Sequence, residues 1–198
     1  MNRRLCLVLI PPMALAACSS QEPANVQLDE ALVAQRSAPL AQAFSTELQG
    51  ELAAAMGEGG ALQAVEICHD AAPRIAADHS AQSGADIRRI SDRNRNPQGS
   101  VSADAAPYYA ELQAQPMADG QPAKRIWASG EGEDAQVHFL AAIPTREQPC
   151  LACHGSEIDP ELQARIGELY PDDLATGFAA GELRGALMIS WPAEEFGL

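Results

Sequence analysis

The sequence predicts an α+β domain in which N-terminal helices pack on a mostly antiparallel sheet. Apolar residues repeat with helical spacing over the first part of the chain, from about residue 28 to about residue 77. Short apolar segments typical of strands follow from residue 87 onward. Helices first and strands later indicate an α+β fold. The domain expected over residues 29–198 is long enough to bury a core of its own.

A long amphipathic helix is expected at the start of this domain. Its apolar residues lie four or eight positions apart on one face: Leu28, Leu32, Leu40, Phe44, Leu48, Leu52 and Met56. Pro39 could kink or divide the helix, and the glycine cluster at residues 57–60 ends it. The apolar face can cover the sheet or pair between subunits, and we favour the first arrangement.

A second helix, four strands and a later helix complete the predicted domain. The second helix spans residues 61–77 and has one apolar face, made of Leu62, Val65, Cys68, Ala72 and Ile75, so the Cys68 side chain points inward. The strands are expected at residues 87–91, 125–128, 137–143 and 183–191. In the last strand, the alternate positions expected to share one face include Leu183, Leu187, Ile189 and Trp191. A short helix over residues 160–169, capped by Asp159, precedes that strand.

The N-terminal residues predict export and a lipid anchor. Arg3 and Arg4 precede an apolar stretch that is too short to span a bilayer, and Leu15-Ala16-Ala17-Cys18 has the form of a lipobox. Residues 1–17 are then a signal peptide, Cys18 carries lipid, and residues 18–28 form a polar linker. Ser19 is typical of lipoproteins of the outer membrane, which predicts a lipid-anchored protein on the periplasmic side of the envelope. The alternative is ordinary cleavage after Ala14-Leu15-Ala16, which leaves a soluble protein.

The chain is acidic. The formal net charge of the full sequence is −14, and removal of Arg3 and Arg4 with the signal peptide makes it −16. This charge argues against nucleic acid as a partner.

Residues 150–154 carry the clearest chemical signal in the sequence. Cys150-Leu151-Ala152-Cys153-His154 is the attachment sequence of c-type haem. Two thiols separated by two residues can form thioethers with the two vinyl groups of one porphyrin, and His154 then supplies the proximal iron ligand. One haem c per chain is expected. The alternatives are a Cys150–Cys153 redox disulfide and a zinc site completed by Cys68 and His154.

Several blocks of sequence, in this order, resemble a known family. They are Ala64-Val65-Glu66-Ile67-Cys68 with Ala72-Pro73, Arg89-Ile90-Ser91 with Arg95-Asn96-Pro97, Cys150-Leu151-Ala152-Cys153-His154-Gly155, Tyr170-Pro171-Asp172-Asp173 with Gly177, and Gly181-Glu182-Leu183-Arg184-Gly185-Ala186. Over most of its length the chain is similar to the PAS-like haem c domain, a family long catalogued as a domain of unknown function. The resemblance implies a PAS-like fold with haem c attached. Members occur alone and as extracytoplasmic sensor portions of histidine kinases, which implies a sensory or redox role.

The resemblance also implies that the iron lies between His154 and a cysteine of the second helix, at the position of Cys68. Independently, Cys68 is the cysteine that remains once Cys18, Cys150 and Cys153 are modified and Cys6 is removed. A buried free cysteine can also be an ordinary core residue. Other side chains are rival iron ligands: His69, His79, His138, Met117 and Met188. Among these rivals His138 is preferred, because strand alternation can turn it toward the core.

A few further residues are candidates for contacts with the haem. Arg89, Arg95 and Asn96 could hold the two propionates, because a guanidinium group binds a carboxylate through two charge-assisted hydrogen bonds. The alternative is a structural loop built on Asn96-Pro97. Trp127 and Trp191 could pack on the porphyrin or belong to the core.

The sequence therefore predicts a lipid-anchored c-type haem protein that senses redox state or a diatomic gas. Its signal is expected to pass to a redox partner or signalling protein of the cell envelope. The alternative is an electron-transfer cytochrome c, in which both iron ligands stay bound through the redox cycle. No distal acid/base constellation of a peroxidase is evident in the sequence, so an enzyme is not expected.

Overall fold

The computed structural model describes residues 27–198 and has the α+β architecture that the sequence predicts. The expected signal peptide, the lipobox and Cys18 lie outside the described residues. The helices are α1 (Glu30–Ser83), α2 (Ala106–Ala114), α3 (Cys150–His154) and α4 (Pro160–Leu169). The strands are β1 (Asp86–Ile90), β2 (Met117–Ala118), β3 (Gln121–Pro122), β4 (Lys124–Ser129), β5 (Gln136–Pro144) and β6 (Leu183–Pro192).

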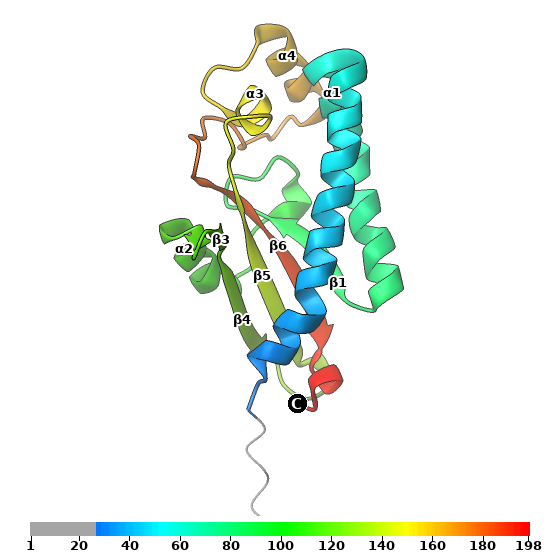
Figure 1. Cartoon of the computed structure of the whole chain (residues 1–198), viewed down its shortest axis with the longest axis vertical. Coiled ribbons are helices and arrows are strands. Elements are labelled where there is room, and N and C mark those ends of the chain that lie inside the picture. Colours follow the sequence, from blue (N-terminus) through cyan, green and yellow to red (C-terminus); the bar gives the residue numbers. More distant parts are fainter. Residues whose placement is uncertain (1–26) are drawn as a thin grey trace, which may run out of the picture.

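The segment α1 is a hairpin of two helices that run in opposite directions along one side of the molecule (Figure 1). The reversal occurs at Gly60, whose φ of 68° and ψ of −158° lie outside the helical region. The predicted end in the glycine cluster is therefore confirmed, and Pro39 does not divide the first helix. The second helix continues beyond the predicted residue 77 to Ser83, where Gly84 adopts the left-handed conformation typical of a helix end.

Four strands form one antiparallel sheet in the order β1-β6-β5-β4. Each end of these strands lies within one residue of its predicted position. The predicted helix over residues 160–169 is confirmed as α4, and the Asp159 side chain accepts hydrogen bonds from the backbone N–H groups of Glu161 and Leu162.

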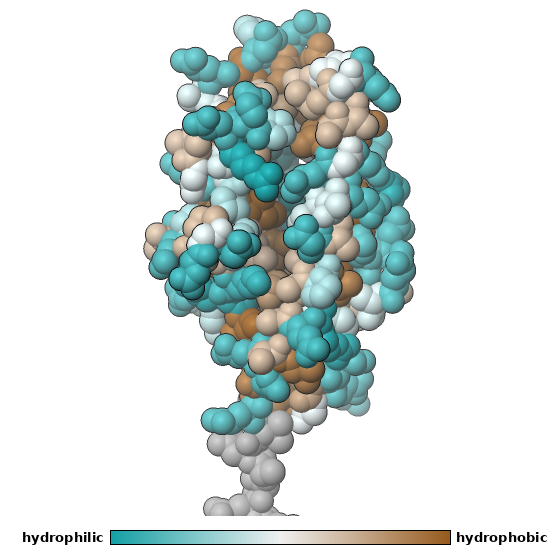
Figure 2. Space-filling view, in the orientation of Figure 1, coloured by the Kyte–Doolittle hydropathy of each residue, from teal (hydrophilic) through white to brown (hydrophobic). Residues whose placement is uncertain are grey.

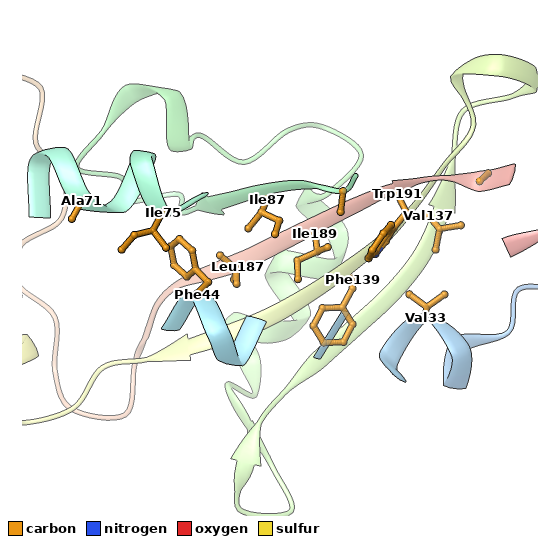
Figure 3. Packing of buried hydrophobic residues seen from close by; sticks show 12 residues of the cluster. Val33, Phe44, Ala71, Ile75, Ile87, Val137, Phe139, Leu187, Ile189 and Trp191 are labelled. Atoms are coloured by element: carbon orange, nitrogen blue, oxygen red, sulfur yellow. The ribbon is translucent and has the colours of Figure 1, made fainter. Parts of the chain in front are cut away.

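The main core lies between α1 and one face of the sheet (Figure 3). Apolar side chains of α1 meet those of β1, β5 and β6, among them Val33, Phe44, Ile75, Ile87, Val137, Phe139, Leu187, Ile189 and Trp191. Full burial of one such side chain stabilises the fold by roughly 1.5–3 kcal/mol. The first helix thus covers the sheet, as favoured from its apolar face. Trp191 belongs to this core, and its Nε1–H donates to Ser37 Oγ at 3.0 Å.

The opposite face of the sheet is covered by α2, which the sequence analysis did not predict. Tyr109 and Leu112 of α2 share a second core with Leu140, Met188 and Trp127. The Trp127 ring stacks on Tyr108 with 4.1 Å between ring centroids. Both tryptophans are therefore core residues, the second of the two roles considered for them.

A bulge at the start of β6 corrects one prediction. Ile143 pairs with Gly185 and Pro144 pairs with Leu183, so Arg184 is an extra residue in β6. The extra residue reverses the alternation of faces. Leu183 consequently packs in the second core with α2, and not with Leu187 as its parity predicts.

The surface combines polar residues with a partly open apolar region. Figure 2 shows a hollow beside α1 with hydrophobic residues in its floor. Ile126, Ala141 and Ile143 of the sheet are half-buried at the margin of the α1 core. Within residues 27–198, the helices lack the combined length and apolarity needed for a membrane span.

Candidate functional site

The attachment motif forms its own short helix, α3, at the end of the sheet where β5 finishes and β6 begins (Figure 1). The connection from β5 is fixed by Thr145, whose N–H donates to Glu182 O at 2.8 Å and whose carbonyl accepts from Gly181 N at 2.8 Å. Residues three apart on a helix lie on one face, so Cys150 and Cys153 lie on the same side of α3. Both thiols are free and half-buried. This arrangement matches the requirement for two adjacent thioethers.

The His154 imidazole is held by a single backbone acceptor. Its Nδ1 lies 2.8 Å from Ala175 O, which fixes the tautomer with the proton on Nδ1. Burial, followed by the positive charges of Arg184 and Arg95, lowers the pKa of His154 to about 2. The ring therefore stays neutral, and Nε2 keeps its lone pair for a metal.

The segment that supplies this acceptor is tied to α3 by backbone hydrogen bonds. Phe178 N donates to His154 O at 2.9 Å, and Gly177 N donates to Gly155 O at 2.9 Å. The Phe178 ring meets the His154 ring edge-on, with centroids 6.4 Å apart. The imidazole orientation is thus set by backbone on one side and by an aromatic ring on the other.

Cys68 lies on the second helix of α1, in the neighbourhood of Cys153. Its neighbour Val65 packs in a small core with Leu162 and Ile166 of α4, and half-buried Cys153 contacts that core. Burial raises the pKa of the Cys68 thiol and Cys153 raises it further, while Arg89 opposes both effects. The structure therefore brings Cys68 to the motif, and its binding to iron stays a prediction.

His138, the preferred rival ligand, lies far from the motif. It is six residues before the end of β5, which corresponds to about 20 Å of strand. Both ring nitrogens already have hydroxyl partners, with Nε2 at 2.8 Å from Ser129 Oγ and Nδ1 at 2.9 Å from Ser190 Oγ. The structure gives His138 a place in the core and does not bring it to α3.

The other rivals have separate surroundings. The His79 ring lies 3.1 Å from Glu47 and links the two helices of α1. His69 is exposed and lies 2.7 Å from Asp70. Met188 is buried in the core with α2, and Met117 is exposed on β2.

Arg95 has protein partners that hold the motif. Its Nη2 donates to Cys153 O at 2.7 Å, and it forms a salt bridge of 3.1 Å with Asp173. The two side chains of the pair are only 10% and 9% exposed. Asp173 Oδ1 also accepts from Ala175 N at 2.9 Å, so the pair supports the acceptor of His154. These are positioning contacts, and propionate binding by Arg95 stays a prediction.

Asn96 has the structural role that was weighed against propionate binding. Its side-chain oxygen accepts from Gln98 N at 3.0 Å and caps the 3-10 turn Pro97–Gly99. A pocket of about 430 Å³ adjoins this loop, between Asn96, Pro73 and Tyr170. Its lining contains none of the residues Cys68, Cys150, Cys153 and His154.

Arg89 and Arg184 bring positive charge to the motif without an acidic partner of their own. Arg89 is half-buried near Cys68 and Cys150. Arg184 is 7% exposed, and its Nε has no hydrogen-bond partner within residues 27–198. Burial and the charges of Arg89 and Arg95 lower the pKa of Arg184 to about 9. Sequence reasoning gave Arg184 no role, although an arginine within an apolar strand was a visible signal.

The described residues hold neither a disulfide at these cysteines nor a cluster of metal-binding side chains. Across the described part of the chain, no group of three or more His, Cys, Asp or Glu side chains is arranged to hold a metal ion. Cys150 and Cys153 are unpaired thiols on α3.

The chain is similar to known proteins both in sequence and in fold. A search of the curated proteins finds no match. The fold matches the crystal structure of the cyanobacterial heme-protein Tll0287 with a TM-score of 0.63 and 23% identity, over 84% of this chain and 97% of that chain. At this level of identity the match establishes the α+β fold. The model of the Tll0287-like family matches residues 19–192, and the chain therefore belongs to the Tll0287-like family.

Proposed function

We propose that the protein binds one c-type haem through Cys150 and Cys153, with the iron between His154 and Cys68. The observation that carries this proposal is the His154 imidazole, which is neutral, oriented by Ala175 O and adjacent to two thiols on one helical face. Such an outer hydrogen bond from Nδ1 is typical of histidine ligands of metals. The cyanobacterial relative of the same fold is described as a heme-protein, which agrees with this proposal.

The residues around the motif suit such a cofactor. Nitrogen and sulfur donors are established axial ligands of haem iron. Arg89 and Arg184 are cations without a salt bridge to a carboxylate of residues 27–198, which suits an anionic cofactor. The hollow with a hydrophobic floor beside α1 is consistent with an apolar macrocycle (Figure 2).

We further propose that the protein senses redox state or a diatomic gas, and that it is not an enzyme. When bound, the iron supplies a reversible one-electron redox change and a coordination position for small ligands. Cys68 is suited to a labile role because burial favours its protonated form, whereas ferric iron and Arg89 favour the thiolate. If iron were bound between His154 and Cys68, its reduction would remove one positive charge, and Cys68 Sγ would then more readily take up a proton from solvent.

The test is the optical and EPR spectrum of the purified holoprotein in both oxidation states. Haem that resists extraction by acid acetone establishes covalent attachment, and extraction of the colour contradicts the proposal. Binding of carbon monoxide by the reduced protein supports release of Cys68. Retention of both ligands after reduction favours an electron-transfer cytochrome c instead.

Location and partner belong to the same proposal. Lipid on Cys18 would hold the domain on the periplasmic side of the envelope, in the outer membrane, and its signal would pass to a redox or signalling protein there. Phase partitioning of the parent and of Cys18→Ser tests the anchor, because loss of the lipid should move the protein from the detergent phase to the aqueous phase. An unmodified N-terminus at Ala17 in mass spectrometry supports the soluble alternative.

A further inference from the structure

Two sheltered arginines differ from most others in residues 27–198 because they form no salt bridge with a carboxylate. Most arginines of residues 27–198 pair with a carboxylate, for example Arg36 with Glu195 and Arg88 with Asp86. In this part of the chain the arginines without such a pair are Arg89, Arg146 and Arg184, and Arg146 is exposed. The two unpaired and sheltered guanidinium groups both lie beside the attachment motif.

The backbone at Arg184 is built to turn this side chain inward. Arg184 is the extra residue of the β6 bulge, and bulges commonly redirect a side chain next to a functional site. The next residue must be small, because a Cβ at Gly185 would lie 2.8 Å from Ile90 O. Ser91 Oγ donates to Arg184 O at 3.1 Å and fixes the bulge to the neighbouring chain.

In the inward position the Arg184 guanidinium forms no salt bridge with a carboxylate of residues 27–198. The residue is 7% exposed, its Nε is unpartnered in the described chain, and its guanidinium carbon lies 5.3 Å from the centre of the Phe178 ring. Phe178 in turn contacts the His154 ring. A buried charge is costly unless it is paired, so this site calls for an anion.

We infer that Arg184 and Arg89 form an oxyanion site beside His154 and Cys68, and that haem propionate carboxylates occupy it. The inference rests on the proposed function for the identity of the occupant. A guanidinium fork matches the planar carboxylate, and two cations match two propionates in charge. A free carboxylate or phosphate from solution has the same chemistry and is the other possible source of the anion.

The experiment compares the holoprotein with Arg184→Met and with the matched control Arg88→Met. Arg88 is on β1 next to Arg89, but it is exposed and paired with Asp86 at 2.9 Å. The propionate bending bands in the resonance Raman spectrum should shift in Arg184→Met and stay unchanged in Arg88→Met. The midpoint potential of Arg184→Met should also fall, because removal of a buried positive charge favours ferric iron.

A second measurement identifies the source of the anion. The melting temperature is measured with increasing phosphate at constant ionic strength. Propionate occupancy predicts that phosphate has no effect on the parent holoprotein. If the Raman bands stay unchanged and phosphate stabilises the parent but not Arg184→Met, a free oxyanion occupies the site and the propionate assignment is overturned. Absence of both responses overturns the oxyanion site itself.

Two controls keep the outcome interpretable. If Arg184→Met does not accumulate, Arg184→Lys keeps the charge but loses the fork, and it should give a smaller shift of the same Raman bands. Extraction of haem from the parent by acid acetone would contradict the proposed function. The phosphate titration of the parent and Arg184→Met would then still test the oxyanion site by itself.

Discussion

Two histidines, His138 on β5 and His154 on α3, show how a structural histidine differs from one available for chemistry. Burial is the main cause of a lowered pKa for both rings, so both are neutral at ordinary pH. Both nitrogens of His138 lie within 2.9 Å of a hydroxyl oxygen, from Ser129 and Ser190. His154 has a partner only for Nδ1 within the described residues, the carbonyl of Ala175. Burial alone therefore does not identify a site, whereas an unused nitrogen beside complementary groups does.

The two rings also differ in the charged groups that surround them. His138 has a carboxylate nearby, with Asp104 at 3.9 Å from Nε2. His154 lies among the guanidinium groups of Arg184, Arg95 and Arg89, all of which lower its pKa. A surplus of positive charge next to a neutral donor is suited to an anionic cofactor. The His138 surroundings are already balanced without one.

Removal of each imidazole in turn should give opposite results, with the largest effect at His154. In His154→Ala, stably attached haem should fall by more than roughly tenfold, because loss of even an outer partner of a metal ligand commonly costs 10–100-fold. His138→Ala should retain haem but lose about 1–3 kcal/mol of stability, because it leaves buried hydroxyls without partners. Haem absorbance per protein and urea unfolding measure the two quantities. Loss of haem from His138→Ala with retention in His154→Ala would reverse the assignment.

The second largest effect is expected at the Arg95–Asp173 pair, which holds the Ala175 acceptor of His154 in place. Asp173→Ala removes the partner of buried Arg95 and an acceptor for Ala175 N. We expect a loss of about 3 kcal/mol in the free energy of unfolding, because it leaves a buried charge unpaired. The control is Glu66→Ala, which breaks an exposed pair with Arg165 and should cost less than about 1 kcal/mol. Equal losses in urea unfolding would show that Arg95 and Asp173 do not act as a buried pair.

Cys68→Ala tests the group proposed to bind the iron on the side opposite His154. Loss of a thiolate donor should raise the midpoint potential by roughly 0.1 V, equal to about 2.3 kcal/mol for one electron. The ferric optical and EPR spectra should change with it, and Cys68→Ser should differ from both parent and alanine variant. An unchanged low-spin ferric spectrum in Cys68→Ala, together with no CO binding by the reduced parent, would exclude the labile thiolate and favour an electron carrier.

Features with a strong local period could be predicted from the sequence. The strand boundaries follow from a period of two residues, and the start of α4 follows from Asp159 and Pro160. Cys68 is half-buried on the helical face that its spacing indicates. The nine-residue helix α2 was missed because two buried residues, Tyr109 and Leu112, are too few to define a period. The β2–β3 hairpin was also missed, although Asp119-Gly120 is a turn signal.

The contacts that hold the candidate site in place could not be predicted from local sequence patterns. The pairing of Arg95 with Asp173 joins residues 78 positions apart, and nothing in either local sequence specifies it. The β6 bulge gives no period of its own, so the face of Leu183 was predicted incorrectly and Arg184 was overlooked. The motif itself was readable because the spacing of its two thiols matches the two vinyl groups of one porphyrin. The residues that orient the motif are distant in sequence and come together only in the folded chain.

The smallest expected effect is a pH dependence of stability that comes from His138. Burial and the charge of Arg88 lower its pKa below the ordinary value of 6.5, while Asp104 and Asp86 oppose the shift. Just below pH 6.5 the unfolded chain therefore binds a proton at this ring that the folded protein does not. The free energy of unfolding should fall as the pH falls from 6.5 toward the lower folded-state pKa.

His138→Gln should remove this contribution while keeping a polar side chain between Ser129 and Ser190. Urea unfolding of parent and variant at pH 7.5 and pH 5.0 gives the required difference, and other titrating groups cancel in the comparison. His69→Gln is the matched control, because His69 is exposed beside Asp70. The gap in stability between the parent and His138→Gln should narrow at pH 5.0, whereas the gap for His69→Gln should change less. Parallel pH profiles for the parent and His138→Gln would show that His138 does not carry the proton-linked part of the stability.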